Sequence, residues 1–77
     1  MVKIGERIKE IRQERGLTQT ELAKEIGISQ AGIAKWETGD RDPSTDCVIL
    51  LAKFFDVTTD FLLGVDDRDL LNKNKKP

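Results

Sequence analysis

Isoleucines near the start of the chain recur at the spacing of one helix face. Ile4, Ile8 and Ile11 stand at i, i+4 and i+7 among charged residues. This pattern predicts an amphipathic helix over residues 3–15, and Gly16 is expected to end it. The first element therefore has one apolar side to bury against the rest of the chain.

Two shorter helices are expected next. Thr18 and Glu21 have the spacing of a capping box, in which the hydroxyl of Thr18 accepts from the amide of Glu21 and the carboxylate of Glu21 accepts from the amide of Thr18. The helix they open ends at Gly27, Ser29 caps the following helix, and Gly39 lies just past its end. The residues expected to face inward are Leu22, Ala23, Ile26, Ile33 and Trp36.

Two further helices complete an all-α prediction. Pro43 and Ser44 open a helix that runs to about Phe55, and Thr58 caps a last short helix over residues 59–63. No segment shows the alternation of apolar and polar residues that is typical of a strand. We expect one five-helix domain over residues 1–65 and a polar tail over 66–77, either flexible or a linker.

Composition narrows the class of protein. The 77 residues are 38% hydrophobic, enough for one core, and no apolar run approaches the roughly 20 residues that span a bilayer. Cys47 is the single cysteine, which fits a reducing compartment, so we expect a soluble cytoplasmic protein. Without His or Tyr, and with no evident carboxylate pair in a cleft, an enzyme is not expected, nor is a metal or cofactor.

The charge balance permits DNA binding without arguing for it. Lys and Arg number 13 against 14 Asp and Glu, which gives a net charge of -1. The charges are uneven: residues 1–41 carry eight basic and seven acidic residues, and residues 42–72 carry two and seven. A face that meets phosphate is therefore expected in the first half, with the acidic part turned away.

The two middle helices have the geometry of a helix-turn-helix. Each spans about two turns, and only Gly27 and Ile28 separate them. Gly27 accepts a positive φ without steric cost, Ala23 is small where the helices cross, and Ile28 and Ile33 fill the wedge between them. Such a pair holds its second helix away from the body, with a polar stripe that fits a major groove.

At this point the sequence resembles a known family. The segments IRQERGLTQTELAKEIGISQAGIAKWETGDRDPS and LLAKFFDVTTDFLLG, within residues 4–64, are similar to the Xre family of phage and bacterial regulators, which includes lambda-type repressors and Cro proteins. The resemblance implies a lambda-repressor-like DNA-binding domain. The matching positions are Gln19, Ala23, Gly27, Ile28, Ile33, Trp36, Glu37 and Gly39.

The resemblance also implies roles for single residues. Gln30, Ala31 and Lys35 stand where the family reads base edges. Because Ala31 has no hydrogen-bonding group, the partner we expect for it is a thymine methyl. The alternative for Gln30 and Lys35 is an ordinary solvated helix surface.

The resemblance also implies that other residues contact the DNA backbone or hold the helices of the domain in position. Gln19 resembles the glutamine that bonds a phosphate and braces the recognition helix, and Arg12 and Glu37 match a pair that ties the first helix to that helix. The loop over residues 39–41 resembles a phosphate-contacting segment, in which Asp40 departs from the family pattern and leaves Arg41 to supply the contact. Independently, the cap at Ser29 leaves amides free to hold a phosphate.

The fourth helix has more apolar residues than one inward face needs. Ile49, Leu50 and Phe54 lie outside the inward stripe formed by Val48, Leu51, Ala52 and Phe55. We expect them, with Phe61 or Leu63, to meet a second copy of the chain. The alternative is that the tail folds back and covers them through Leu70 and Leu71.

Three further features of the sequence have two interpretations each. Trp36 is expected in the core rather than as a stacking surface for bases. Cys47 is expected as a small buried apolar residue rather than a redox sensor. Asp66, Asp67 and Asp69 lack the Gly and the closing Glu of a calcium loop, which favours a solvated linker.

The function these patterns predict is sequence-specific binding of double-stranded DNA. We expect a transcriptional regulator, a repressor that binds a palindromic operator as a homodimer. The alternative is a protein-interaction module, such as an antitoxin or a co-regulator, which the apolar surplus and the acidic second half favour.

Overall fold

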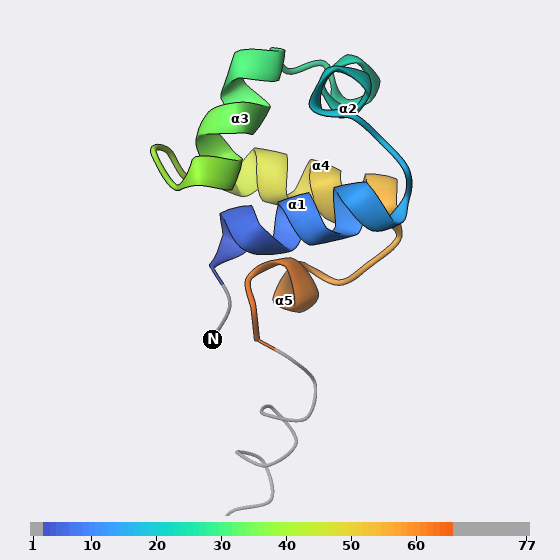
Figure 1. The fold of residues 1–77 in the computed structure, drawn as a ribbon. Helices are drawn as coiled ribbons and strands as arrows, with labels where there is room; N and C mark the ends of the chain where they lie inside the picture. The colour runs from blue at the N-terminus through green and yellow to red at the C-terminus, as the bar shows by residue number, and fades with distance from the viewer. Residues whose placement is uncertain (1–2, 66–77) are drawn as a thin grey trace, which may run out of the picture.

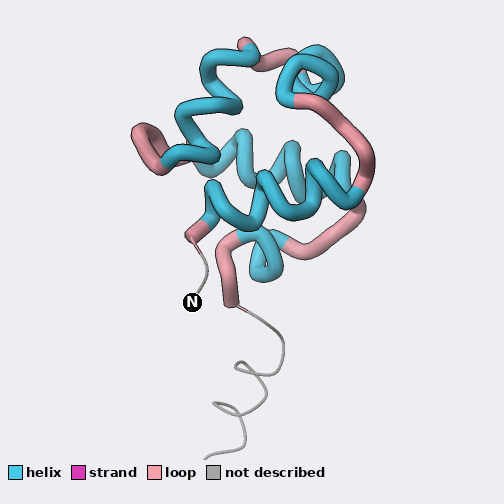
Figure 2. The backbone as a smooth tube through the Cα atoms, in the orientation of Figure 1, coloured by secondary structure: helices cyan, strands magenta, loops and turns pink. Residues whose placement is uncertain are grey.

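The computed structural model describes residues 3–65, and within this range it contains five helices and no strand (Figures 1 and 2). The all-α prediction is confirmed. Helix α1 crosses the middle of the molecule in front of α4, with α2 and α3 on one side of it and α5 on the other (Figure 1). The helices are α1 Ile4–Glu14, α2 Gln19–Ile26, α3 Gln30–Thr38, α4 Thr45–Phe55 and α5 Thr59–Leu62.

The helix ends follow the capping residues read from the sequence. The hydroxyls of Thr18, Ser29, Ser44 and Thr58 each accept an amide of the following first turn, and Thr18 with Glu21 forms the complete capping box. The amide and hydroxyl of Thr18 lower the pKa of Glu21, because both stabilise its charged form. Helices α1 and α5 are slightly shorter than expected, since Lys3 is the N-cap of α1, Arg15 is its C-cap and Leu63 is the C-cap of α5.

A single core lies between the helices. Trp36 is 5% exposed and belongs to it, which excludes the stacking surface considered for this residue. Cys47 is half-buried and packs against the core. The buried apolar residues are Ile8, Ile11, Leu22, Ala23, Ile26, Ile33, Trp36, Val48, Leu51, Ala52, Phe55 and Leu62.

Phe54 and Phe61, which the sequence analysis considers for contact with a second copy, are only partly exposed in the monomer. Phe54 is half-buried because its ring packs against the edge of the Phe55 ring, with 5.1 Å between centroids. Phe61 is half-buried because the guanidinium of Arg7 covers its ring at 4.4 Å. Leu70 and Leu71, the alternative cover, lie outside the described residues.

Three apolar side chains are left exposed on α4 and α5. Ile49 is 42% exposed, Leu50 41% and Leu63 45%. Ile49 and Leu63 line a pocket of about 280 Å³ together with Thr45, Val48 and Thr59. These three side chains are called the apolar patch below. Within residues 3–65, no helix is long and apolar enough to cross a membrane.

Candidate nucleic-acid interface

Helix α3 is held against the body by one face and exposes the other. Its inner side chains, Ile33 and Trp36, are buried, while Gln30, Ala31 and Lys35 are exposed. The turn that precedes it is tight because Gly27 has a φ of 73° and the amide of Ile28 donates to the carbonyl of Ala23 at 3.0 Å. The three exposed residues are those the resemblance assigns to base reading, and all three lie on one element.

The N-terminus of α3 has no acidic side chain in its first turn. Ser29 Oγ accepts the amide of Gly32 at 3.0 Å, which uses one of the amides that a helix start leaves unpaired. Each of the other four helices carries an Asp or Glu in its first turn. The partial positive charge at the start of α3 is therefore left uncompensated by the helix itself, a setting that favours an anion.

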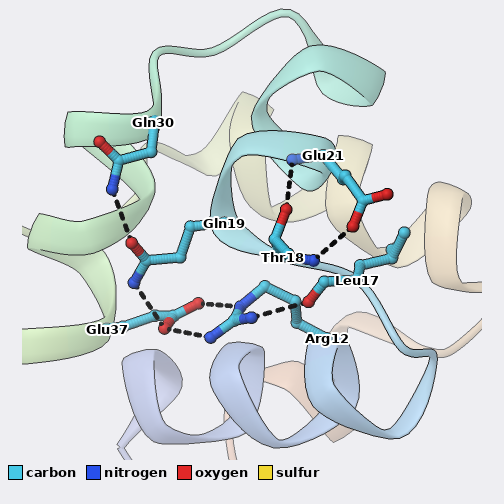
Figure 3. A network of polar contacts seen from close by, with 7 residues as sticks. All are labelled: Arg12, Leu17, Thr18, Gln19, Glu21, Gln30 and Glu37. Atoms are coloured by element: carbon cyan, nitrogen blue, oxygen red, sulfur yellow. Dashed lines mark hydrogen bonds and ion pairs between the residues drawn. The ribbon is translucent and has the colours of Figure 1, made fainter.

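Arg12 and Glu37 form a buried ion pair that ties α1 to the end of α3 (Figure 3). Arg12 Nε donates to Glu37 Oε2 at 2.6 Å, and Nη2 donates to Oε1 at 2.9 Å. The two side chains are 9% and 3% exposed. The hydrogen bond to Glu37 raises the pKa of Arg12, so the guanidinium stays charged throughout the working range of pH.

The remaining guanidinium nitrogen of Arg12 is also engaged within the protein. Nη1 donates to the carbonyl of Leu17 at 2.7 Å, in the loop before α2. Every nitrogen of this guanidinium thus already has an acceptor from the chain itself. The geometry fits a residue that positions α2 and α3.

Gln19 joins this pair to the start of α3 (Figure 3). Its Nε2 donates to Glu37 Oε1 at 3.0 Å, and its Oε1 accepts from Gln30 Nε2 at 2.7 Å. Sequence reasoning assigned Gln19 a bracing role but missed its bond to Glu37. The sequence holds one indication of this chain of contacts. Gln19 and Gln30 each directly follow a capping residue, so both side-chain amides lie at helix starts.

The far end of α3 brings Arg41 back to the helix. Gly39, with a φ of 86°, reverses the chain, and the amide of Arg41 then donates to the carbonyl of Lys35 at 3.2 Å. Lys35, Arg41 and the acidic Asp40 are all exposed. This backbone hydrogen bond brings two basic residues, Lys35 and Arg41, together at the C-terminal end of α3.

Gly5 is a positioning residue that sequence reasoning missed. It is buried on α1, and a Cβ placed on it would clash with the backbone carbonyl oxygen of Trp36. Because it has no side chain, α1 can lie directly against the last turn of α3. A glycine inside an amphipathic helix pattern was the only signal of this close approach.

The comparisons with known proteins agree with this geometry. A family model described as "Helix-turn-helix" matches residues 8–62. The HTH-type transcriptional regulator ImmR of Bacillus subtilis (strain 168) is 41% identical over 76 residues, which cover 91% of this chain and 60% of ImmR. Antitoxin PezA of Streptococcus pneumoniae serotype 4 is 33% identical over 63 residues, which cover 82% of this chain and 40% of PezA.

A solved structure gives the same fold. The P22 c2 repressor, in complex with a synthetic operator, superposes with a TM-score of 0.79 at 30% identity, covering 86% of this chain and all of that one. The chain spans 60% of the length of ImmR and a smaller share of PezA. The sequence match and the shared fold show that this chain belongs to the helix-turn-helix family of transcriptional regulators, of the Xre and lambda-repressor type.

Proposed function

We propose that this chain binds a specific double-stranded DNA sequence through α3. It acts as a transcriptional regulator, a repressor that works in the cytoplasm. The observation that carries the proposal is the side chain of Gln30. It stands exposed at the outer tip of α3 and is held there by Gln19. A free surface glutamine is mobile, whereas a base-reading side chain gains when its position is fixed before binding.

In this proposal the phosphates position the domain. The first-turn amides of α3, which Ser29 caps, hold one phosphate, and Gln19 and Arg41 contact others. These contacts supply most of the affinity and make it depend on salt. They set the depth and the register of α3 in the groove.

The exposed side chains of α3 then read base edges. Gln30 offers a donor and an acceptor that match N7 and N6 of adenine, Ala31 meets a thymine methyl, and Lys35 donates to guanine O6 or N7. Ala31 and Lys35 lie about 40° apart around the helix, so they face the same strip of the groove. Gln30 reads from the tip and the other two read along the side.

The proposed unit on DNA is a homodimer joined through the apolar patch. Ile49 and Leu63 are exposed beside one pocket, and Leu50 is exposed next to Ile49 in the sequence of α4. A two-fold axis through such a surface would set two copies of α3 about 34 Å apart, one turn of DNA. The preferred site is then an inverted repeat.

The proposal is tested by selecting from a pool of randomised duplex DNA and titrating the recovered duplex at several salt concentrations. We expect one preferred sequence with inverted symmetry and a steep loss of affinity as salt rises. Recovery of no preferred sequence, with weak binding at all salt concentrations, would overturn the proposal.

A second candidate is a protein-interaction module that uses the apolar patch for another protein. The exposure of Ile49, Leu50 and Leu63 favours it, and a relative of this chain is an antitoxin. The same titration separates the two, because an interaction module shows neither a preferred duplex nor a steep salt slope.

A further inference from the structure

We propose that Glu37 fixes, through Gln19, the order in which Gln30 presents its hydrogen-bond donor and acceptor to a base pair. Glu37 thereby decides between an A·T pair and its inverse at the position that Gln30 reads. This inference rests on the proposed function, since it assumes that Gln30 meets a base. It assigns a specificity role to a buried side chain that does not itself reach DNA.

The first step is the chemistry of the Glu37 carboxylate. An ionised carboxylate only accepts hydrogen bonds, and both oxygens of Glu37 accept from the Arg12 guanidinium. The Glu37 side chain is 3% exposed, so water has little access to it. Any neighbouring amide must therefore turn its NH2 group toward Glu37.

The second step is the orientation of the Gln19 amide. Gln19 Nε2 lies 3.0 Å from Glu37 Oε1, as the carboxylate requires. If the amide were turned over, its carbonyl oxygen would face a negatively charged oxygen, and both would lose a hydrogen bond. Because Nε2 is committed to Glu37, only Oε1 of Gln19 is left for α3.

The third step carries the same constraint to Gln30. Gln19 Oε1 accepts, so Gln30 must present Nε2 to it, and the distance is 2.7 Å. One N–H of this Nε2 and the oxygen Oε1 remain for DNA. The nitrogen of Gln30 points toward Gln19, at the start of α2, and its oxygen points away from Gln19 (Figure 3).

The fixed order matters because base pairs present an ordered pattern in the major groove. Adenine offers the N7 acceptor beside the N6 donor, and the inverse pair offers them in the opposite order from the other strand. A glutamine whose amide turns over freely satisfies both orders. A glutamine with one allowed orientation satisfies only one.

The test measures a ratio of affinities rather than an affinity. The duplex is the one selected from the randomised pool, and the position read by Gln30 is the one at which Gln30→Ala loses discrimination. The ratio compares the selected base pair at that position with its inverse. For the unaltered chain we expect roughly 5- to 150-fold, the discrimination of one good bidentate contact.

Substitutions at Glu37 distinguish its effect on the donor and acceptor order of Gln30 from its effect on packing. Glu37→Gln has nearly the same shape but accepts or donates, so the ratio should fall to about one. Glu37→Asp keeps an acceptor-only group and should retain most of the ratio, even where overall affinity drops. Glu25→Gln removes one negative charge from an exposed position of α2 and is the matched control, expected to leave the ratio unchanged.

Substitutions at Gln19 test the relay without touching the ion pair, which matters if Glu37→Gln fails to fold. Gln19→Met provides no acceptor for Gln30, so the ratio should fall to about one.

Two outcomes overturn the inference while leaving the proposed function intact: a preferred duplex at which Glu37→Gln and Gln19→Met keep the full ratio, or one at which Gln30→Ala changes no position. The absence of any preferred duplex would instead mean that the proposed function itself fails.

Discussion

The side chains of Arg12 and Glu37 fix the positions of several neighbouring groups in this domain. A single buried pair holds α1 to α3 and also supplies the acceptor for Gln19. Buried pairs gain little over a well-packed apolar replacement, but a lone partner left behind is costly. The pair therefore serves to position the helices, and its removal should lower both the free energy of unfolding and the affinity for DNA.

We expect Arg12→Met to lower the free energy of unfolding by about 3–5 kcal/mol, because it leaves the Glu37 carboxylate buried with only Gln19 as partner. Urea denaturation followed by circular dichroism measures the loss. Lys9→Met, on the exposed side of α1, is the matched control and should change stability by less than about 0.5 kcal/mol. A loss below about 1 kcal/mol for Arg12→Met would show that solvent reaches the pair.

The close contact between α1 and the end of α3 depends on Gly5. Alanine normally favours a helix over glycine by about 1 kcal/mol. Here the added methyl would meet the backbone carbonyl of Trp36, which a side-chain rotation cannot move aside. The clash should therefore outweigh the gain in helix propensity.

Gly5→Ala is expected to destabilise the domain by about 1–3 kcal/mol, the usual cost of overpacking. It should also weaken DNA binding, since α3 must shift to make room. Thermal unfolding and titration with the selected duplex measure the two effects, with Lys9→Ala as the control on the same helix. If Gly5→Ala proves more stable than the parent chain, the close approach drawn from the structure is wrong.

The helices and their ends are predictable from sequence because their signals are local. Thr18, Ser29 and Ser44 act within their own first turns, and the spacing of the isoleucines defines the buried face of α1. The bond from Gln19 to Glu37 joins residues 18 positions apart, so no local pattern encodes it. The partial burial of Phe61 is not encoded locally for the same reason, because the Arg7 guanidinium that covers its ring comes from another helix.

The base-reading residues were assigned from family resemblance rather than from physical pattern. The structure shows Gln30, Ala31 and Lys35 exposed on α3, and the assignment of bases to them stays a prediction. The resemblance implies for Arg12 either a phosphate contact or a positioning role. The three bonds of its guanidinium, to Glu37 and Leu17, favour the positioning role, and no local sequence pattern encodes them.

Residues 3–65 expose two different groups of side chains. One is the polar stripe of α3, and the other is the apolar patch of Ile49, Leu50 and Leu63 on α4 and α5. Isolated exposed apolar residues are ordinary, but Ile49 and Leu63 lie beside a common pocket, which is typical of a contact site. In the proposed function, dimerisation through the apolar patch gives the DNA site its symmetry.

We expect Leu50→Lys to prevent dimer formation on DNA while the monomer stays folded, because a lysine opposite its own copy places two like charges in an apolar contact. Analytical ultracentrifugation with the selected duplex measures the stoichiometry. Asp56→Asn changes the charge by the same amount, and Asn tolerates the φ of 56° at that position, so it serves as control. Two copies of Leu50→Lys on each duplex, bound as tightly as the parent, would exclude this surface as the interface.

The most direct measurement is the affinity of Gln30→Ala for the selected duplex and for a random duplex, each at one fixed salt concentration. If α3 reads sequence from its tip, the variant should lose about 1–3 kcal/mol of binding free energy on the selected duplex and almost nothing on the random one. Phosphate contacts are the same on both duplexes, so they cannot produce such a difference. Equal losses on the two duplexes would contradict base reading by Gln30, and with it the proposed mode of recognition.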